Sequence, residues 1–374
     1  MIDKTQRLNE SLDSFLTEYK EKNEGNKYRP VAVGRYGIRT RESIYSKELA
    51  KDYSKNKLIF KNTLTVGMGS TQIDIGVLSE DATYAVSPAY HTYRIHDINS
   101  DYLRYCLECR NQDMFVRYVK RGSRQGKSID LKRWITYKIP VYPESVQAEI
   151  VKRLDSVKAI LSLREQELNA LDDLIKARFV EMFGDPVSNP YKLPMILLGE
   201  LSELITKGAS PSWQGFNYTD DPSQTLFLTS ENVKNGYIDL SSPKYIEDKF
   251  NTKQKRSIVH KGDFLINIVG ASIGRAAQFN LNCKANMNQA AALVRINDNR
   301  IRDKYLLTYL NSDKAQLMYD SMKSDTGRAN LSLKDISELS ILLPSIEEQL
   351  IFEKVVAQID KSKSHSPRLP NPPL

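Results

Sequence analysis

The feature that most constrains the fold of this 374-residue chain is an internal repeat at an offset of about 200 residues. Leu58–Gly76 aligns with Ser257–Gly274, and each stretch indicates a strand, a glycine turn and a second strand. Later segments match in the same order: His91–Ile95 with Ala292–Ile296, Asp101–Tyr118 with Asp303–Met322, and Gly126–Lys132 with Gly327–Lys334. Because this period is far too long for a solenoid, it predicts a duplicated α+β domain, with each copy followed by its own helix.

The helix expected after the first copy has the clearest periodicity in the chain. Ten positions follow an unbroken 4-3-4-3 spacing, and eight of them are apolar, which predicts a coiled-coil seam. The apolar seam positions are Ile150, Leu154, Val157, Leu161, Leu168, Leu171, Ile175 and Met182. At a rise of 1.5 Å per residue, such a helix is roughly 50 to 60 Å long. We expect it to end at Gly184-Asp185-Pro186, because glycine can close a helix and proline cannot continue one.

The helix expected after the second copy is short. Phe352, Val355 and Ile359 follow helical spacing, but four of the last eight residues are prolines, which exclude a helix there. At the other end of the chain, Leu8, Leu12, Phe15 and Tyr19 follow a 4-3-4 spacing. We therefore hypothesise that an N-terminal helix over residues 1–24 completes the distal coiled coil, as in a circular permutant.

The overall composition predicts a globular protein with real cores. Hydrophobic residues make up 40% of the chain, which suffices for two or three ordinary domains. Apolar runs are only a few residues long, whereas a membrane span needs roughly 20. We expect no signal peptide, because the first residues are charged and amphipathic, and three cysteines cannot build a disulfide framework. We therefore expect a cytoplasmic protein.

Charge is unevenly distributed within the formal net value of +8. Val141–Asp185 contains six basic and nine acidic residues, whereas Lys27–Arg41 contains five basic residues and no acidic one. Phe115–Arg133 contains seven basic residues and a single acidic one. Basic clusters interleaved with Tyr and Phe are typical of proteins that bind nucleic acids. Charge alone leaves a merely solvated basic surface as the alternative.

Two glycine or proline motifs suggest chemistry that the rest of the sequence does not support. Gly122–Ser128 resembles a phosphate-binding loop, but it is one residue short between its glycines and follows no clear apolar strand. We expect a basic loop against a nucleic-acid backbone, with a solvated loop as the alternative. Asn371–Leu374 mimics the Asn-Pro-Pro-aromatic motif of amino-methyltransferases, but it lacks the aromatic residue and a glycine-rich cofactor loop.

Cysteines and histidines give no support for a metal or catalytic site. Cys106 and Cys109 have no second pair that would complete a zinc site, so we interpret them as core cysteines. The four histidines show no arrangement of nucleophile and base, and no acidic triplet suggests a metal nuclease. We therefore predict no catalytic residue, no metal and no cofactor on this chain.

Several segments taken together resemble the specificity (S) subunits of type I restriction-modification systems. Pro143–Gln147, the long seam and the run Phe179–Pro186 (FVEMFGDP) resemble the central conserved region of that family. Leu198–Leu201, Lys207–Pro211 and Ser230–Gly236 resemble the usual opening of a target-recognition domain. The chain departs from the family pattern in two places, because the first copy lacks a clear Leu-Gly-Glu opening and a Pro-rich tail replaces the end of the distal helix.

The resemblance implies an α+β fold in which two repeated target-recognition domains are joined by long antiparallel coiled-coil helices. The expected layout is an N-terminal helix (1–24), recognition domain 1 (25–140), a central conserved helix (141–185), recognition domain 2 (186–343), a distal conserved helix (344–364) and a Pro-rich tail (365–374). The family function is to read a bipartite target on double-stranded DNA without catalytic residues. Two methyltransferase (M) subunits, which use S-adenosylmethionine, and nuclease-translocase (R) subunits are the implied partners.

Charge and repeat position select the residues that we expect to contact DNA. They are Arg35, Arg39, Arg121, Arg124 and Lys127 in the first copy, and Lys207, Trp213, Lys253, Lys255, Arg256, Lys323 and Arg328 in the second. We expect Trp134 to pack inside its domain, whereas Trp213 leaves packing and DNA contact equally open. For docking of the methyltransferase we predict the helix faces around Leu163, Leu174, Phe179 and Phe183.

A second interpretation belongs to another functional class. The chain would then be an adaptor or decoy that binds methyltransferase subunits through its helices without directing them to DNA. The shortened distal helix keeps this interpretation open, and sequence-dependent DNA binding by the assembly separates the two.

Overall fold

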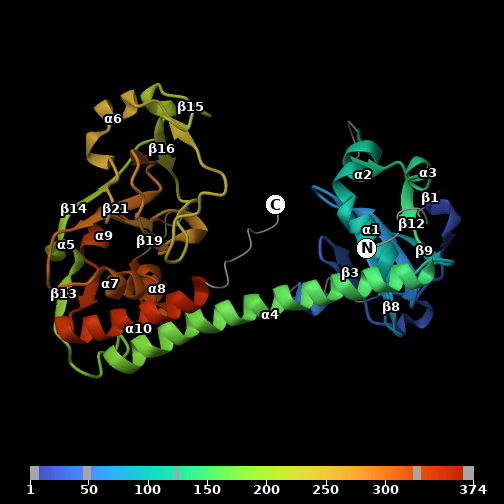
Figure 1. Cartoon of the computed structure of the whole chain (residues 1–374), viewed down its shortest axis with the longest axis horizontal. Helices are drawn as coiled ribbons and strands as arrows, with labels where there is room; N and C mark the ends of the chain where they lie inside the picture. Colours follow the sequence, from blue (N-terminus) through green and yellow to red (C-terminus); the bar gives the residue numbers. More distant parts are fainter. Residues whose placement is uncertain (1–7, 45–51, 123–125, 323–329, 365–374) are drawn as a thin grey trace. The chain divides into compact units, whose positions relative to one another are not determined.

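The computed structural model describes residues 8–44, 52–122, 126–322 and 330–364. The chain divides into two compact units, residues 1–161 and 162–374, each of which has its own sheets and helices (Figure 1). Within the described ranges, every helix is too short or too polar to span a bilayer.

The first unit is built on a four-stranded antiparallel sheet with the strand order β2-β9-β6-β7. These strands are β2 (Leu16–Tyr19), β6 (Thr63–Met68), β7 (Ile73–Leu78) and β9 (His91–Ile95). Two helices, α1 (Ser100–Cys109) and α2 (Asn111–Tyr118), pack on β7 and bury one face of the sheet. Asn99 caps α1, because its side chain accepts a hydrogen bond from the Tyr102 N–H.

Short strand pairs complete the first unit. They are β1 (Leu8–Ser11) with β12 (Lys138–Val141), β3 (Val31–Gly34) with β4 (Gly37–Thr40), β5 (Lys57–Phe60) with β8 (Thr83–Val86), and β10 (Val119–Gly122) with β11 (Gly126–Ile129). One turn of helix, α3 (Leu131–Trp134), leads into β12.

The N-terminal helix predicted for residues 1–24 is wrong where the structure describes that segment. Residues 8–19 form β1, a 3₁₀ turn at Leu12–Ser14 and β2, and they belong to the core of the first unit. Leu12 is buried, but Leu8 is exposed, so the 4-3-4 spacing does not correspond to one buried face. Tertiary pairing decides the structure, because β1 and β2 find strand partners about 80 to 130 residues further along the chain. Recognition domain 1 therefore begins well before residue 25.

The second unit repeats this architecture. Its main sheet has the order β14-β21-β18-β19, formed by β14 (Ser202–Lys207), β18 (Phe264–Asn267), β19 (Ala276–Gln278) and β21 (Ala291–Ile296). Helices α7 (Asp303–Leu310) and α8 (Asp313–Met322) follow the sheet, as α1 and α2 do in the first unit. The pair β13 (Met195–Leu197) and β22 (Ser340–Leu342) corresponds to β1 and β12. The structural repeat therefore also includes the N-terminal strand β1, which the alignment of the two halves of the sequence did not detect.

A second sheet and two short helices complete the second unit. The sheet has the order β15-β17-β16-β20, and its strands are β15 (Tyr218–Thr219), β16 (Thr225–Leu228), β17 (Tyr245–Ile246) and β20 (Ala285–Met287). The short helices beside β14 are α5 (Leu198–Leu201) and α9 (Leu333–Ser337). Helix α6 (Lys249–Lys253) packs on the second sheet through Phe250.

Each unit is followed by its own helix: α4 (Glu144–Phe183) and α10 (Ile346–Ser364). A buried glutamine fixes the start of each helix. At the start of α4, Gln147 accepts a hydrogen bond from the Asn99 N–H (2.9 Å) and donates one to the Tyr142 carbonyl. At the start of α10, Gln349 accepts a hydrogen bond from the Arg302 N–H (2.8 Å) and donates one to the Pro344 carbonyl. The same polar clamp therefore ties both helices to the first turn of the helix pair in their own unit.

Within the second unit, α10 runs antiparallel to the end of α4, as Figure 1 shows. Phe352 near the start of α10 contacts Phe179 and Phe183, whereas Lys363 near its end pairs with Asp172 at 2.6 Å. α4 ends before Gly184, whose φ of 75° closes the helix; a Cβ there would lie 2.7 Å from Pro190.

Candidate nucleic-acid interface

The predicted seam of α4 is covered along one half and open along the other. Leu168 is buried, Leu171 is half-buried, and Ile175 and Met182 pack against the core of the second unit. Nearer its start, Ile150 packs against the core of the first unit. The intervening side chains are exposed at 38% for Leu154, 50% for Val157 and 40% for Leu161. A continuous seam is thus absent from the described residues, because α10 reaches only part of α4.

Two of the four predicted docking residues are not available to a partner. Phe179 and Phe183 are buried in an aromatic cluster, with ring centroids 5.3 Å and 4.9 Å from Tyr305. Phe352 closes the cluster from α10, and burial raises the pKa of the neighbouring Tyr309 to about 12. The assignment of Phe179 and Phe183 to a partner surface is therefore wrong, since they join α4 to its own unit. Leu163 and Leu174 are exposed, and their docking role stays a prediction.

In the first unit, two predicted DNA contacts meet at the tip of the β3–β4 hairpin. Arg35 and Arg39 lie over the ring of Tyr36, with guanidinium-to-centroid distances of 5.8 Å and 5.1 Å. Tyr36 is 69% exposed, and Gly34 and Gly37 pair across the turn. Sequence reasoning selected the two arginines and missed Tyr36, although its position between them in the run Gly34-Arg-Tyr-Gly37 was the available signal. The tip presents two cations and one aromatic ring together.

The β10–β11 hairpin carries the remaining predictions for the first unit. Lys127 is exposed on β11; its Nζ donates to the Ser70 carbonyl and lies 5.5 Å from the centre of the Phe115 ring. Arg121 lies opposite Lys127 in the register of β10. Arg124 lies outside the described residues. Because Gly126 begins the strand β11 and does not lead directly into a helix, this segment does not have the geometry of a phosphate-binding loop.

In the second unit, the predicted contacts Trp213, Lys253, Lys255 and Arg256 are all exposed. Lys253 ends α6, and its Nζ donates to the Gln214 carbonyl at 3.1 Å, which places this cation beside the turn that carries Trp213. Lys255 and Arg256 follow on a 3₁₀ turn. Lys207 is the exposed last residue of β14. Lys323 and Arg328 lie outside the described residues.

The two tryptophans occupy opposite environments. Trp134 is fully buried in the core of the first unit, with its ring centroid 6.0 Å from that of Tyr93, in agreement with the packing role expected for it. Trp213 is 86% exposed, so packing inside its unit is excluded for its side chain. The cysteines also differ: burial raises the pKa of Cys106 to about 11, whereas Cys109 is exposed and is not the core residue that the sequence suggested.

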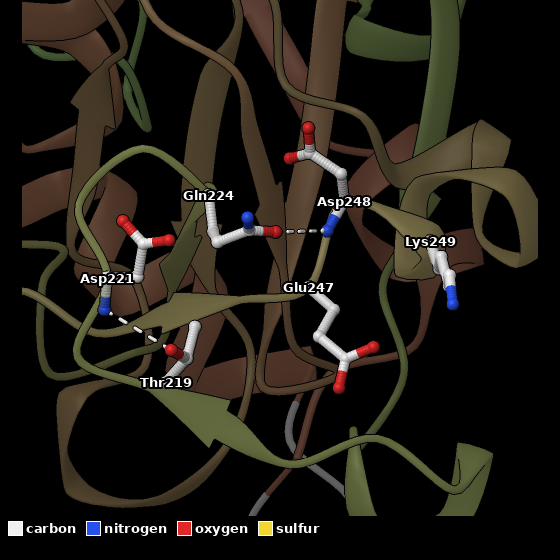
Figure 2. Close-up of a pocket in the computed structure, with 6 residues that line it drawn as sticks. All are labelled: Thr219, Asp221, Gln224, Glu247, Asp248 and Lys249. Atoms are coloured by element: carbon white, nitrogen blue, oxygen red, sulfur yellow. Dashed lines mark hydrogen bonds between the residues drawn. The ribbon is translucent and has the colours of Figure 1, made fainter.

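A shallow depression at the start of α6 does not suit phosphate. Thr219, Asp221, Gln224, Glu247, Asp248 and Lys249 line it, and Figure 2 shows carboxylate side chains from both of its sides. Lys284 and Thr225 hold the pKa of Asp248 below its usual range, and hydrogen bonds from Ser223 lower that of Asp221, so both carboxylates stay charged. Among the residues that the model describes, no group of three His, Cys, Asp or Glu side chains could hold a metal ion.

Comparison with protein families gives one match along most of the chain. The model of the type I restriction modification DNA specificity domain matches residues 13–173 and, again, residues 196–368. The two matched segments correspond to the two copies of the internal repeat.

Two curated proteins illustrate the similarity. The specificity subunit of the type I restriction enzyme EcoBI from Escherichia coli is 32% identical over 127 residues, which are 34% of this chain and 27% of that protein. A protein from Methanocaldococcus jannaschii, named for the specificity subunit of type I restriction enzyme MjaX, is 22% identical over 266 residues, or 69% of this chain and 61% of its relative. The match thus spans less than two thirds of either relative.

Solved structures share the fold. A chain from a study of complex assembly and conformational transition in a type I R-M system is 16% identical, with a TM-score of 0.51 over 96% of this chain and 90% of that one. The S subunit of a type I restriction-modification system from M. genitalium is 14% identical, with a TM-score of 0.51 over 98% of this chain and 92% of that one. These likenesses confirm the predicted α+β class with two repeated domains.

Proposed function

The chain belongs to the type I restriction-modification DNA specificity family, and from this premise we propose that it reads a bipartite target on double-stranded DNA, with one half-site for each unit. The observation that carries the proposal is that one sheet architecture occurs twice, and each copy carries its own exposed group of cations and an aromatic ring. Two similar readers on one chain suit a target in two parts.

The exposed cations and aromatic rings divide the work of binding in a way that DNA requires. We assign phosphate contacts to four exposed cations, Arg39, Lys127, Lys253 and Lys255. Such contacts fix the register of the protein on the duplex without reading sequence. Base identity then depends on side chains that reach the groove edges. The exposed rings of Tyr36 and Trp213 lie beside these cations and are our candidates for such contacts.

In this proposal, the chain itself is not an enzyme and binds no cofactor. Adenine methylation belongs to two methyltransferase subunits that carry S-adenosylmethionine, and DNA cleavage belongs to nuclease-translocase subunits. Exposed apolar side chains on α4 support docking of a helical partner: they are Leu163, Leu174 and, nearer the start of the helix, the seam residues Leu154, Val157 and Leu161.

Co-expression with a methyltransferase subunit of a type I system, followed by methylation sequencing of host DNA, tests the proposal. We expect a methylated adenine motif in two parts. Replacing residues 195–342 by the same region of another specificity subunit should change one half of the motif and leave the other half unchanged. A complex that forms without any motif would support the adaptor interpretation, and the absence of a complex would contradict the docking role of the helices.

A further inference from the structure

The turn that follows β14 exposes an unusual side chain. Trp213 lies in the 3₁₀ turn Ser212–Gln214, and no large hydrophobic side chain among the described residues is more exposed than its 86%. Leaving an indole in water forgoes the burial that normally stabilises a fold, so a tryptophan at this position calls for a binding role.

The turn is held in place by backbone and side-chain contacts on both sides of Trp213. The Pro211 carbonyl accepts hydrogen bonds from the Gln214 N–H (2.9 Å) and the Phe216 N–H (3.0 Å). Phe216 anchors the far end, since its ring centroid lies 5.4 Å from that of Phe250 in a small buried cluster. Because the turn is already ordered, presenting Trp213 to a partner costs little conformational entropy.

The near end of the turn is fixed by Gly208. Its N–H donates to the Asn288 carbonyl at 3.2 Å, and a Cβ at this position would collide with the carbonyl oxygen of Met287. Only glycine permits this approach of two backbones, so the turn leaves the sheet along a defined path. Trp213 is therefore presented from a rigid platform.

The segment that ends α6 places basic residues beside the turn that carries Trp213. Lys253 reaches the carbonyl of the adjacent Gln214, and Lys255 and Arg256 lie within three residues of Lys253. Within the described ranges, none of these three cations forms an ion pair with an acidic side chain. An exposed indole next to a basic segment suits a polyanion that also offers flat apolar groups, which is the chemistry of DNA.

We propose that Trp213 is a base-contacting residue of the second unit, whose indole enters a groove of the half-site and packs against the bases while the neighbouring cations hold the flanking phosphates. This inference rests on the proposed DNA-reading function and assigns one specificity-determining contact within it. The competing possibility is that Trp213 docks on a partner protein. The neighbouring cations, which have no acidic partner among the described residues, disfavour it.

Oxidative footprinting with mass spectrometry tests the contact in the assembled complex of the chain with methyltransferase subunits. The readout is oxidation of the Trp213 peptide, measured for the free chain, for the complex, and for the complex with a duplex that carries the methylated motif. The second tryptophan, Trp134, is buried and should stay unreactive throughout, which makes it an internal control for folding. We expect protection of Trp213 on addition of the duplex, with none from complex formation alone.

Affinity measurements with three variants separate an apolar contact from a phosphate contact. Trp213→Ala should weaken binding of the motif duplex at least tenfold without changing the slope of log affinity against log salt, and Trp213→Phe should recover part of the loss. Lys255→Ala should instead reduce that slope by about one unit, because it removes one phosphate contact.

The outcomes distinguish the inference from its premise. Unchanged affinity of Trp213→Ala, or protection of Trp213 by the methyltransferase alone, would overturn the base contact while the wild-type complex still binds its motif. Failure of the wild-type complex to bind or methylate any bipartite motif would instead overturn the proposed function.

Discussion

The two units share one sheet but differ in the loops that decorate it. Strand orders β2-β9-β6-β7 and β14-β21-β18-β19 are equivalent, and each sheet is followed by a helix pair and a long helix. In the first unit, the exposed aromatic ring and its cations lie at the β3–β4 hairpin, whereas in the second they lie on the turn after β14 and at the end of α6. The scaffold is therefore constant while the exposed aromatic and cationic groups differ in position, which suits the proposed reading of two half-sites.

The end of α4 packs into the second unit through a buried aromatic cluster. Phe183 is fully buried among Tyr305, Phe179 and Phe352 of the second unit. Phe183→Ala should destabilise the second unit by about 3 to 5 kcal/mol, because it deletes a ring from a packed core and leaves a cavity. Hydrogen exchange measured on peptides of both units should show faster exchange in α7 and α10 and unchanged exchange in β6 and β9. Leu174→Ala, on the exposed face of the same helix, is the matched control and should change neither. Equal effects of the two substitutions would contradict the core assignment.

One repeat position compares the two sheets directly. Arg94 and Arg295 occupy equivalent positions in β9 and β21. Arg295 makes two hydrogen bonds to the buried carboxylate of Asp263, at 2.8 Å and 2.7 Å, and this pairing raises the pKa of Arg295. Arg94 pairs with Glu21 at the surface, with both side chains half-exposed, and lies 4.3 Å from the centre of the Phe60 ring.

Removing each arginine should therefore have unequal effects. Arg295→Ala leaves Asp263 buried without its partner, and we expect a loss on the order of 3 kcal/mol in the stability of the second unit. Arg94→Ala should cost only about 1 kcal/mol in the first, since exposed pairs and exposed cation–π contacts are weak. Urea unfolding of each variant measures both free energies. The double variant Asp263→Asn/Arg295→Ala tests the cause of this loss. If the double variant were no more stable than Arg295→Ala alone, the unpaired carboxylate of Asp263 would not be responsible for the loss of stability.

Sequence reasoning recovered the elements that have a local signature and missed those that depend on distant partners. The duplication and the long periodic helix are visible because glycine turns and heptad spacing are local patterns. Residues 8–19 form strands only because β12 and β9 lie beside them, and strands of four residues carry too little periodicity to reveal this.

The error at Phe179 and Phe183 has a similar physical origin. Both side chains extend the apolar stripe of α4 beyond the seam, and a sequence cannot show whether a partner protein or the same chain covers that stripe. Here Tyr305 and Phe352 of the second unit cover it. The exposed ring of Tyr36 was missed for a different reason. The candidate DNA contacts were selected by charge, and Tyr36 is a neutral residue between two arginines.

The smallest expected effect concerns the hairpin of the first unit, and it sharpens the contrast with Trp213. Arg39→Ala should weaken binding of the motif duplex severalfold and reduce the salt slope by about one unit, because one phosphate contact is lost. Tyr36→Phe should leave the slope unchanged, since it keeps the ring that both arginines face. Fluorescence anisotropy of a labelled duplex at several salt concentrations measures both quantities. If Arg39→Ala lowered affinity at every salt concentration by the same factor, Arg39 would contact a base and not a phosphate.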